Sequence, residues 1–109
     1  MYQSKAVVAD YETVYFAQIV QVETVWILSR AYGFSRADVT LVLESLMNNE
    51  AFRLESEECF VTALQLYTFS NIDFSDAQIL QASLQRKIKL LSFDKKLQKL
   101  KGVVNPDFI

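Results

Sequence analysis

Three carboxylates in this sequence lie within or next to apolar segments, where a charged side chain needs an explanation. Glu23 lies inside the apolar run QIVQVETVWIL, Asp76 lies in NIDFSDAQIL, and Asp94 directly follows KIKLLSF. Clustered carboxylate oxygens are suitable ligands for hard cations such as Mg²⁺ or Mn²⁺. Each of the three residues also has a plainer interpretation, and none of them identifies a metal site by itself.

Glu23 is the most informative of the three. Helical spacing places it on the same side of its helix as Ile19, Trp26 and Ile27, so we expect its side chain to face inward. Burying an unpaired carboxylate costs several kcal/mol, and such a residue therefore needs a partner, a metal or a water-filled cleft. The alternative is a partly exposed helix position or a salt bridge.

Asp73 and Asp76 stand at the start of a predicted helix. Asp73 is well placed as the N-cap, with Asp76 three residues later in the manner of a capping box, while Ser75 competes for the same role. Asp76 also precedes Leu80 by four residues and so shares the apolar face of that helix. Capping or stabilisation by the helix dipole is the alternative to metal binding for Asp76.

Asp94 follows a predicted buried strand. Ligands of open α/β sheets bind just beyond the carboxyl ends of strands, which makes this position suitable for a site. The alternative is that Asp94 caps the helix DKKLQKL. If the three carboxylates meet at one end of a parallel sheet, they form a cation site.

The residue types that are missing exclude several kinds of catalytic and metal site. The sequence has no histidine, which excludes Ser-His and Cys-His triads and histidine-ligated zinc. Cys59 is the single cysteine, expected to be packed in a helix, and it cannot form an internal disulfide, so we expect a reducing cytoplasm. No apolar run approaches the roughly 20 residues of a membrane span, and the N-terminus does not resemble a signal peptide. A soluble cytoplasmic protein is expected.

Hydrophobic patterning predicts strands that alternate with helices. The chain of 109 residues is 51% hydrophobic with two glycines and one proline, which indicates a single domain over residues 1–109. Predicted helices cover residues 3–10, 20–31, 36–47, 56–69, 73–88 and 94–101, and predicted strands cover residues 13–19, 51–55, 88–93 and 103–104. This alternation is typical of an α/β fold with a mainly parallel sheet.

Three segments, in this order, resemble the PIN-domain family of metal-dependent ribonucleases, most closely the small bacterial toxins of toxin–antitoxin pairs. They are VETVWILSRAYGFSRADV, ALQLYTFSNIDFSDAQILQAS and LLSFDKKLQKLKGV, and they span most of the chain from about Gln18 to Val104. The acids of DFSDA and SFDKKL are a specific signal when they occur together with the earlier ETVWIL. The resemblance implies a PIN-like three-layer α/β/α fold.

The resemblance also implies roles for individual residues. Glu23, Asp76 and Asp94 match the family's catalytic acids, which hold Mg²⁺ or Mn²⁺ and so activate a water that cleaves an RNA phosphodiester. Ser92 matches the small hydroxyl residue two positions before the last acid, and Ser92 and Asp73 are expected to support the ligands. The implied partners are an RNA substrate, a cognate antitoxin protein and a second copy in a homodimer.

The N-terminal part departs from the family pattern. Family members begin with a hydrophobic strand that ends in an acid, whereas MYQSKAVVADYETVYFA has the character of the helix and second strand that follow it. We therefore expect an N-terminally truncated fold without the first metal-binding acid. Unpaired backbone groups are costly, so a rearranged sheet or an edge covered by a partner chain is expected.

Two functions stay open at this point. The first is a metal-dependent ribonuclease, for which seven of the eleven basic residues offer a phosphate-facing patch, although a solvated helix face explains them equally well: Arg86, Lys87, Lys89, Lys95, Lys96, Lys99 and Lys101. The second is a degenerate PIN-like module that does not cleave RNA and instead binds an antitoxin-like protein or a second copy. The missing strand and the many aromatic residues motivate this alternative, with core packing as the plainer account of the aromatics.

Overall fold

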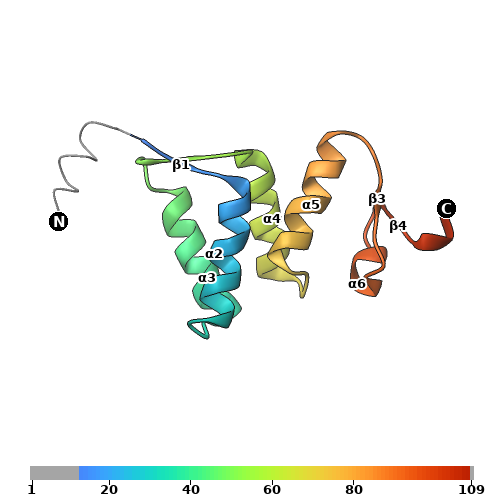
Figure 1. Ribbon diagram of the computed structural model, residues 1–109, viewed down its shortest axis with the longest axis horizontal. Coiled ribbons are helices and arrows are strands. Elements are labelled where there is room, and N and C mark those ends of the chain that lie inside the picture. Colours follow the sequence, from blue (N-terminus) through green and yellow to red (C-terminus); the bar gives the residue numbers. More distant parts are fainter. Residues whose placement is uncertain (1–12, 109) are drawn as a thin grey trace. The chain divides into compact units, whose positions relative to one another are not determined.

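The computed structural model describes residues 13–108 (Figure 1). These residues fall into two compact units. The first unit extends to Glu57 and the second begins at Glu58. The predicted helix at residues 3–10 lies outside the described residues. No helix in the described part of the chain has the length and the apolar composition needed to cross a membrane.

The first unit is a parallel strand pair connected by two helices. Strand β1 (Val14–Phe16) leads into helix α2 (Gln18–Arg30), and helix α3 (Arg36–Met47) leads into strand β2 (Phe52–Leu54). The two strands pair in parallel, with Val14 opposite Phe52 and Phe16 opposite Leu54. Ser35 caps α3, because its hydroxyl accepts a hydrogen bond from the Asp38 backbone N–H at 3.1 Å.

Strand β1 is shorter than the predicted strand at residues 13–19. The chain turns into α2 at Gln18, whose backbone N–H donates to the Glu55 carboxylate at 2.7 Å. The fully buried amide of Gln21 donates to the Phe16 carbonyl at 2.9 Å and to the Glu55 carbonyl at 3.2 Å. These bonds satisfy polar groups that would otherwise be buried without partners, so the helix starts two residues earlier than the apolar pattern predicts.

The predicted inward orientation of Glu23 is wrong. Glu23 is exposed, and so are the apolar residues predicted to share its side of α2: Ile19 is 71% exposed, Trp26 58% and Ile27 42%. The helix instead buries Gln21 and Val25. Helix α2 therefore packs through Gln21 and Val25. Within the described residues, the side with Ile19, Trp26 and Ile27 is not its packed side.

The second unit contains the other helices and a second parallel strand pair. Helix α4 (Glu57–Phe69) and helix α5 (Phe74–Gln85) are followed by strand β3 (Leu90–Leu91), helix α6 (Lys95–Gln98), strand β4 (Val103–Val104) and a short 3₁₀ helix (Pro106–Phe108). Strand β3 pairs in parallel with β4, Leu90 opposite Val103 and Leu91 opposite Val104.

Aromatic side chains form the core of this second unit. The ring of Phe74 packs edge-on against Phe60 and Tyr67, with centroids 5.7 and 6.0 Å apart, and all three residues are buried. Cys59 is buried beside them, as predicted, and its burial raises the pKa of the thiol. A thiol with a raised pKa is a poor nucleophile, so Cys59 has a packing role.

Strand β3 and helix α6 are both shorter than predicted. The Ser92 backbone N–H still donates to the Val104 carbonyl at 3.0 Å, but the Asp94 N–H donates to the Ser92 hydroxyl and so leaves the strand ladder. At the other end, Gly102 opens β4 with a φ of +93°, and a Cβ there would lie 2.6 Å from a methyl group of Leu84. A glycine is therefore required where the chain returns to the sheet.

The predicted α/β class with parallel strands is confirmed. The strands of the described residues form two separate pairs, β1 with β2 and β3 with β4. Each pair belongs to one unit, and each has its connecting helices between its two strands in the sequence.

Candidate functional site

Asp94 is positioned by a network of local hydrogen bonds. Its Oδ1 accepts from the backbone N–H groups of Lys96 at 2.8 Å and Leu97 at 3.4 Å, so the predicted capping role is confirmed. The Ser92 hydroxyl accepts from the Asp94 N–H at 3.0 Å, and the Gln98 amide donates to the Ser92 carbonyl at 2.8 Å. The capping bonds use Oδ1, and a carboxylate has further acceptor positions on its second oxygen. Capping therefore leaves Asp94 able to bind a cation.

Asp73 and Asp76 stand at the start of α5, and only part of the predicted capping arrangement is present. Asp73 has the extended backbone of an N-cap residue, but its side chain makes no capping hydrogen bond. Ser75 lies within the helix and is not the cap. Asp76 lies in the first helical turn and is half-buried, where the helix dipole favours a negative charge.

The electrostatics of Asp76 connect these two segments. Burial raises the pKa of the Asp76 carboxyl, and the negative charges of Asp73 and Asp94 raise it further, while the Lys96 ammonium lowers it. Asp73 and Asp94 are therefore close enough to Asp76 to influence its charge, although Asp76 and Asp94 are separated in the sequence by the rest of α5 and by β3. The second unit thus contains the acids of two of the three motifs that the sequence singles out, and the charge of Asp94 influences Asp76.

Glu23 belongs to the first unit and lies on the exposed side of α2. Among residues 13–108, no three acidic, histidine or cysteine side chains form a group that can hold a metal ion by themselves. The expected cluster of three carboxylates is therefore not formed by the described side chains alone.

The donor set of the second unit nevertheless fits a small hard cation. Mg²⁺ keeps several of its waters and is bound in proteins through one or two carboxylates together with substrate phosphates. Asp76 and Asp94 supply two such carboxylates, and their mutual repulsion, which raises the pKa of Asp76, would be relieved by a cation. Oxygen donors of this kind favour hard divalent cations over softer metals.

Lys96 is a residue that the sequence does not single out from the other basic residues. Its influence on Asp76 places it near the acidic pair, and its backbone N–H binds Asp94. The signal for it in the sequence is its position two residues after a capping acid, which is common in proteins and identifies nothing by itself.

The basic residues are concentrated in the second unit. All seven that lie between Arg86 and Lys101 are exposed. From Glu58 onward the chain carries seven basic and five acidic residues, a formal charge of +2, whereas residues 1–57 carry four basic and eight acidic residues, a formal charge of −4. The overall charge of −2 is therefore the sum of an acidic first part and a cationic second part that contains Asp94.

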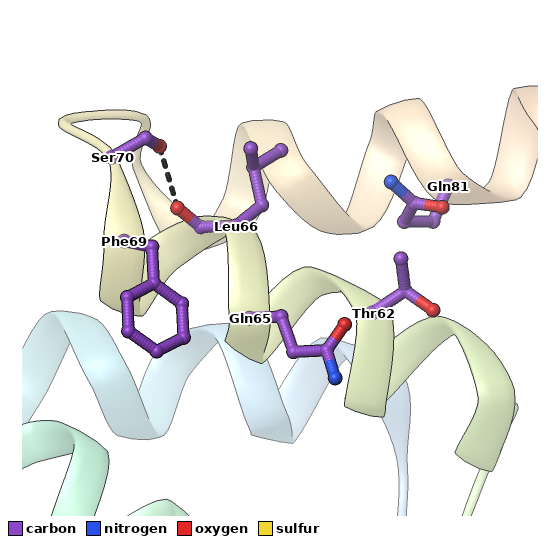
Figure 2. Close-up of a pocket in the computed structure, with 6 residues that line it drawn as sticks. All are labelled: Thr62, Gln65, Leu66, Phe69, Ser70 and Gln81. Atoms are coloured by element: carbon purple, nitrogen blue, oxygen red, sulfur yellow. Dashed lines mark hydrogen bonds between the residues drawn. The ribbon is translucent and has the colours of Figure 1, made fainter.

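A groove of about 330 Å³ lies on the second unit beside helices α4 and α5 (Figure 2). It is lined by Thr62, Gln65, Leu66, Phe69, Ser70 and Gln81, and the Ser70 hydroxyl donates to the Leu66 carbonyl at its rim. None of these side chains is a carboxylate or a cation. The groove therefore lacks the groups needed for metal-dependent chemistry, and the acidic pair is the better candidate site.

Comparison with known proteins identifies the family. A model of the PIN domain matches residues 2–103, which is nearly the whole chain and covers both units. The chain therefore belongs to the PIN-domain family, a class of nuclease-type domains that generally bind RNA and use divalent metal ions. The chain has no match among the curated proteins or the solved structures.

Proposed function

We propose that this protein is a metal-dependent endoribonuclease. The observation that carries the proposal is the association of Asp76 with Asp94 in the second unit of a PIN-family chain, beside an exposed group of lysines. Two carboxylates supply oxygen ligands for Mg²⁺ or Mn²⁺, and the lysines supply positive charge for the RNA backbone.

The chain's own residues would have the following roles. Asp76 and Asp94 hold the ion, and Glu23 is included as a further ligand on the resemblance of its motif alone. Ser92 and Asp73 support the ligands, Ser92 by fixing the backbone of Asp94. The Lys96 ammonium, which lowers the pKa of Asp76, would offset charge on a bound phosphate. The bound ion would lower the pKa of a water and offset charge on the phosphoryl oxygens.

The biological setting belongs to the same proposal. We infer a single PIN domain over residues 1–109, supported by the extent of the family match. We also infer a toxin of a toxin–antitoxin pair that acts in the cytoplasm, binds a cognate antitoxin and forms a homodimer. The resemblance of the three sequence segments supports this setting.

Cleavage of RNA by matched variants tests the proposed activity. Asp76→Asn removes one ligand charge with little change in shape, and loss of one ligand is expected to lower the cleavage rate at least 100-fold in Mg²⁺ or Mn²⁺. Asp107→Asn changes an exposed acid of the same unit and is expected to cleave like the unmodified chain. The assay is gel analysis of a labelled single-stranded RNA, with EDTA as the metal-free control.

Equal cleavage by the unmodified chain and by Asp76→Asn would contradict the assignment of the site. No cleavage and no Mn²⁺ binding by calorimetry would contradict the ribonuclease proposal itself.

The second candidate function is a binding module without catalytic activity. The exposed apolar side of α2, with Ile19, Trp26 and Ile27, favours it, because an apolar helix side is an expected interaction surface. Light scattering after size exclusion tests self-association through this side, and the cleavage assay separates the two candidates. Under this proposal the unmodified chain is a dimer and Trp26→Ser shifts it towards the monomer, whereas a monomer in both cases would contradict self-association.

A further inference from the structure

Phe93 is an aromatic side chain beside the candidate site that packing does not explain. It lies between Ser92 and Asp94, and 76% of its surface is exposed. A single exposed apolar residue is ordinary on a protein surface. Its surroundings set this one apart, because it adjoins an acid of the proposed metal site and precedes two exposed lysines, Lys95 and Lys96.

The backbone that carries Phe93 is held on both sides. Ser92 binds the Asp94 N–H through its hydroxyl and the Gln98 amide through its carbonyl, and its own N–H joins the ladder to Val104. Asp94 in turn binds the first N–H groups of α6. A ring presented from a backbone fixed in this way loses little conformational entropy when a partner covers it.

The combination of a ring and cations is the combination that binds single-stranded nucleic acid. Bases stack on exposed aromatic rings while lysines contact the phosphates, and the bases of a duplex are not free to do so. A purely apolar partner would gain nothing from the flanking ammonium groups. An acidic peptide would use the lysines, but only an aromatic side chain in it could stack on Phe93, whereas every nucleotide carries a flat base.

We propose that Phe93 stacks on a base of single-stranded RNA next to the phosphodiester held at Asp76 and Asp94. This inference rests on the proposed ribonuclease function and adds the residue of this chain that contacts a base of the substrate. Neighbouring phosphates contact Lys95 and Lys96, so strand binding and base stacking occur on the same short segment of the chain.

Binding to labelled RNA tests the role of the ring. Fluorescence anisotropy is measured with a single strand of about ten nucleotides, in EDTA to prevent cleavage and again with Ca²⁺. Phe93→Ala is expected to bind about tenfold more weakly, and Phe93→Trp at least as tightly as the unmodified chain, because stacking contributes about 1–3 kcal/mol per base and 1.4 kcal/mol corresponds to tenfold.

Phe69→Ala is the matched control. Phe69 is another phenylalanine of the second unit, 85% exposed at the end of α4, and its removal is expected to leave RNA affinity unchanged. A second control uses an abasic strand of equal length, which keeps the phosphates but lacks bases. The unmodified chain and Phe93→Ala are expected to bind it equally.

Each other outcome overturns the inference in a recognisable way. Equal RNA affinity of the unmodified chain and Phe93→Ala would exclude stacking and leave the proposed ribonuclease untouched. Weaker binding of Phe93→Ala to the abasic strand, a changed oligomeric state or a lowered melting temperature would show a structural role. If the unmodified chain binds no RNA in either buffer, the inference fails, and the separate cleavage assay decides the proposed function.

Discussion

At the scale of single residues, the candidate site is defined by opposing electrostatic effects on Asp76. Its carboxyl is half-buried, near two other negative charges and near one ammonium group, and the net effect raises its pKa. A carboxylate held in this way costs stability when it is ionised, and proteins tolerate such a cost where the charge has a use.

The pH dependence of stability follows from the sign of this shift. In the interval just above its ordinary pKa of 3.8, Asp76 binds more protons in the folded chain than in the unfolded chain. The free energy of unfolding contributed by this group therefore falls as the pH rises through that interval and stays lower at neutral pH. Asp76→Asn is expected to melt at a higher temperature than the unmodified chain at pH 7 and to lose this advantage near pH 3.

Thermal unfolding followed by circular dichroism checks this expectation. Asp107→Asn is the control, and its melting temperature is expected to follow that of the unmodified chain at both pH values. A lower melting temperature for Asp76→Asn at pH 7 would show that the charge of Asp76 stabilises the fold. Adding Mg²⁺ is expected to raise the melting temperature of the unmodified chain more than that of Asp76→Asn.

At the scale of the elements, the end of α5 is closed by an unusual residue. Lys87 follows the helix with a φ of +58°, in the left-handed region that glycine normally occupies. Its N–H donates to the Leu84 carbonyl at 3.0 Å, and the Ile88 N–H donates to the Ser83 carbonyl at 3.1 Å. This pair of bonds satisfies carbonyls at the helix end and turns the chain towards β3.

Replacing Lys87 with glycine is expected to stabilise the protein. A side chain in the left-handed region costs about 1 kcal/mol, which Lys87→Gly removes while it keeps both hydrogen bonds. We expect a gain of about 0.5–1 kcal/mol in the free energy of unfolding, measured by urea denaturation. Lys87→Ala removes the same charge but keeps the strained backbone, so it should show no such gain. A similar gain in both variants would assign the effect to charge and not to φ.

At the scale of the whole molecule, charge is divided between the two units. The formal charge is −4 over residues 1–57 and +2 over residues 58–109, and the family match covers most of both. An RNA-binding role for the cationic part is compatible with an acidic chain because exposed charges act over about 10 Å at 0.1 M salt. Local charge therefore decides binding more than the net value does.

The salt dependence of RNA affinity measures how many of these cations contact phosphate. Each contact contributes about 0.7 to the slope of log affinity against log salt concentration for a single strand. Replacing Lys99 and Lys101 together with glutamine is expected to lower the magnitude of the slope by up to about 1.4. Arg30→Gln, which removes an exposed charge from the first unit, should leave the slope unchanged. An unchanged slope in the double variant would exclude phosphate contacts at Lys99 and Lys101.

Local features of this protein follow directly from its sequence. The caps at Ser35 and Asp94 join residues two or three positions apart, at 3.1 Å for Ser35 with Asp38 and 2.8 Å for Asp94 with Lys96. Short-range bonds of this kind are independent of the rest of the fold, so neighbouring residues predict them. The same holds for the alternation of strands and helices and for the three motifs that identify the family.

Tertiary structure alone decided the features that depend on residues far apart in the chain. Strand β1 ends at Phe16 because Glu55, 37 positions after Gln18, binds the start of α2. Glu23 is exposed because α2 packs through Gln21 and Val25, and no spacing rule distinguishes one apolar side of a helix from another. The charge of Asp94 influences Asp76 only through the packing of the second unit. Capping is a contact between neighbours, whereas burial and charge coupling are set by the whole fold, and the candidate site depends on the latter.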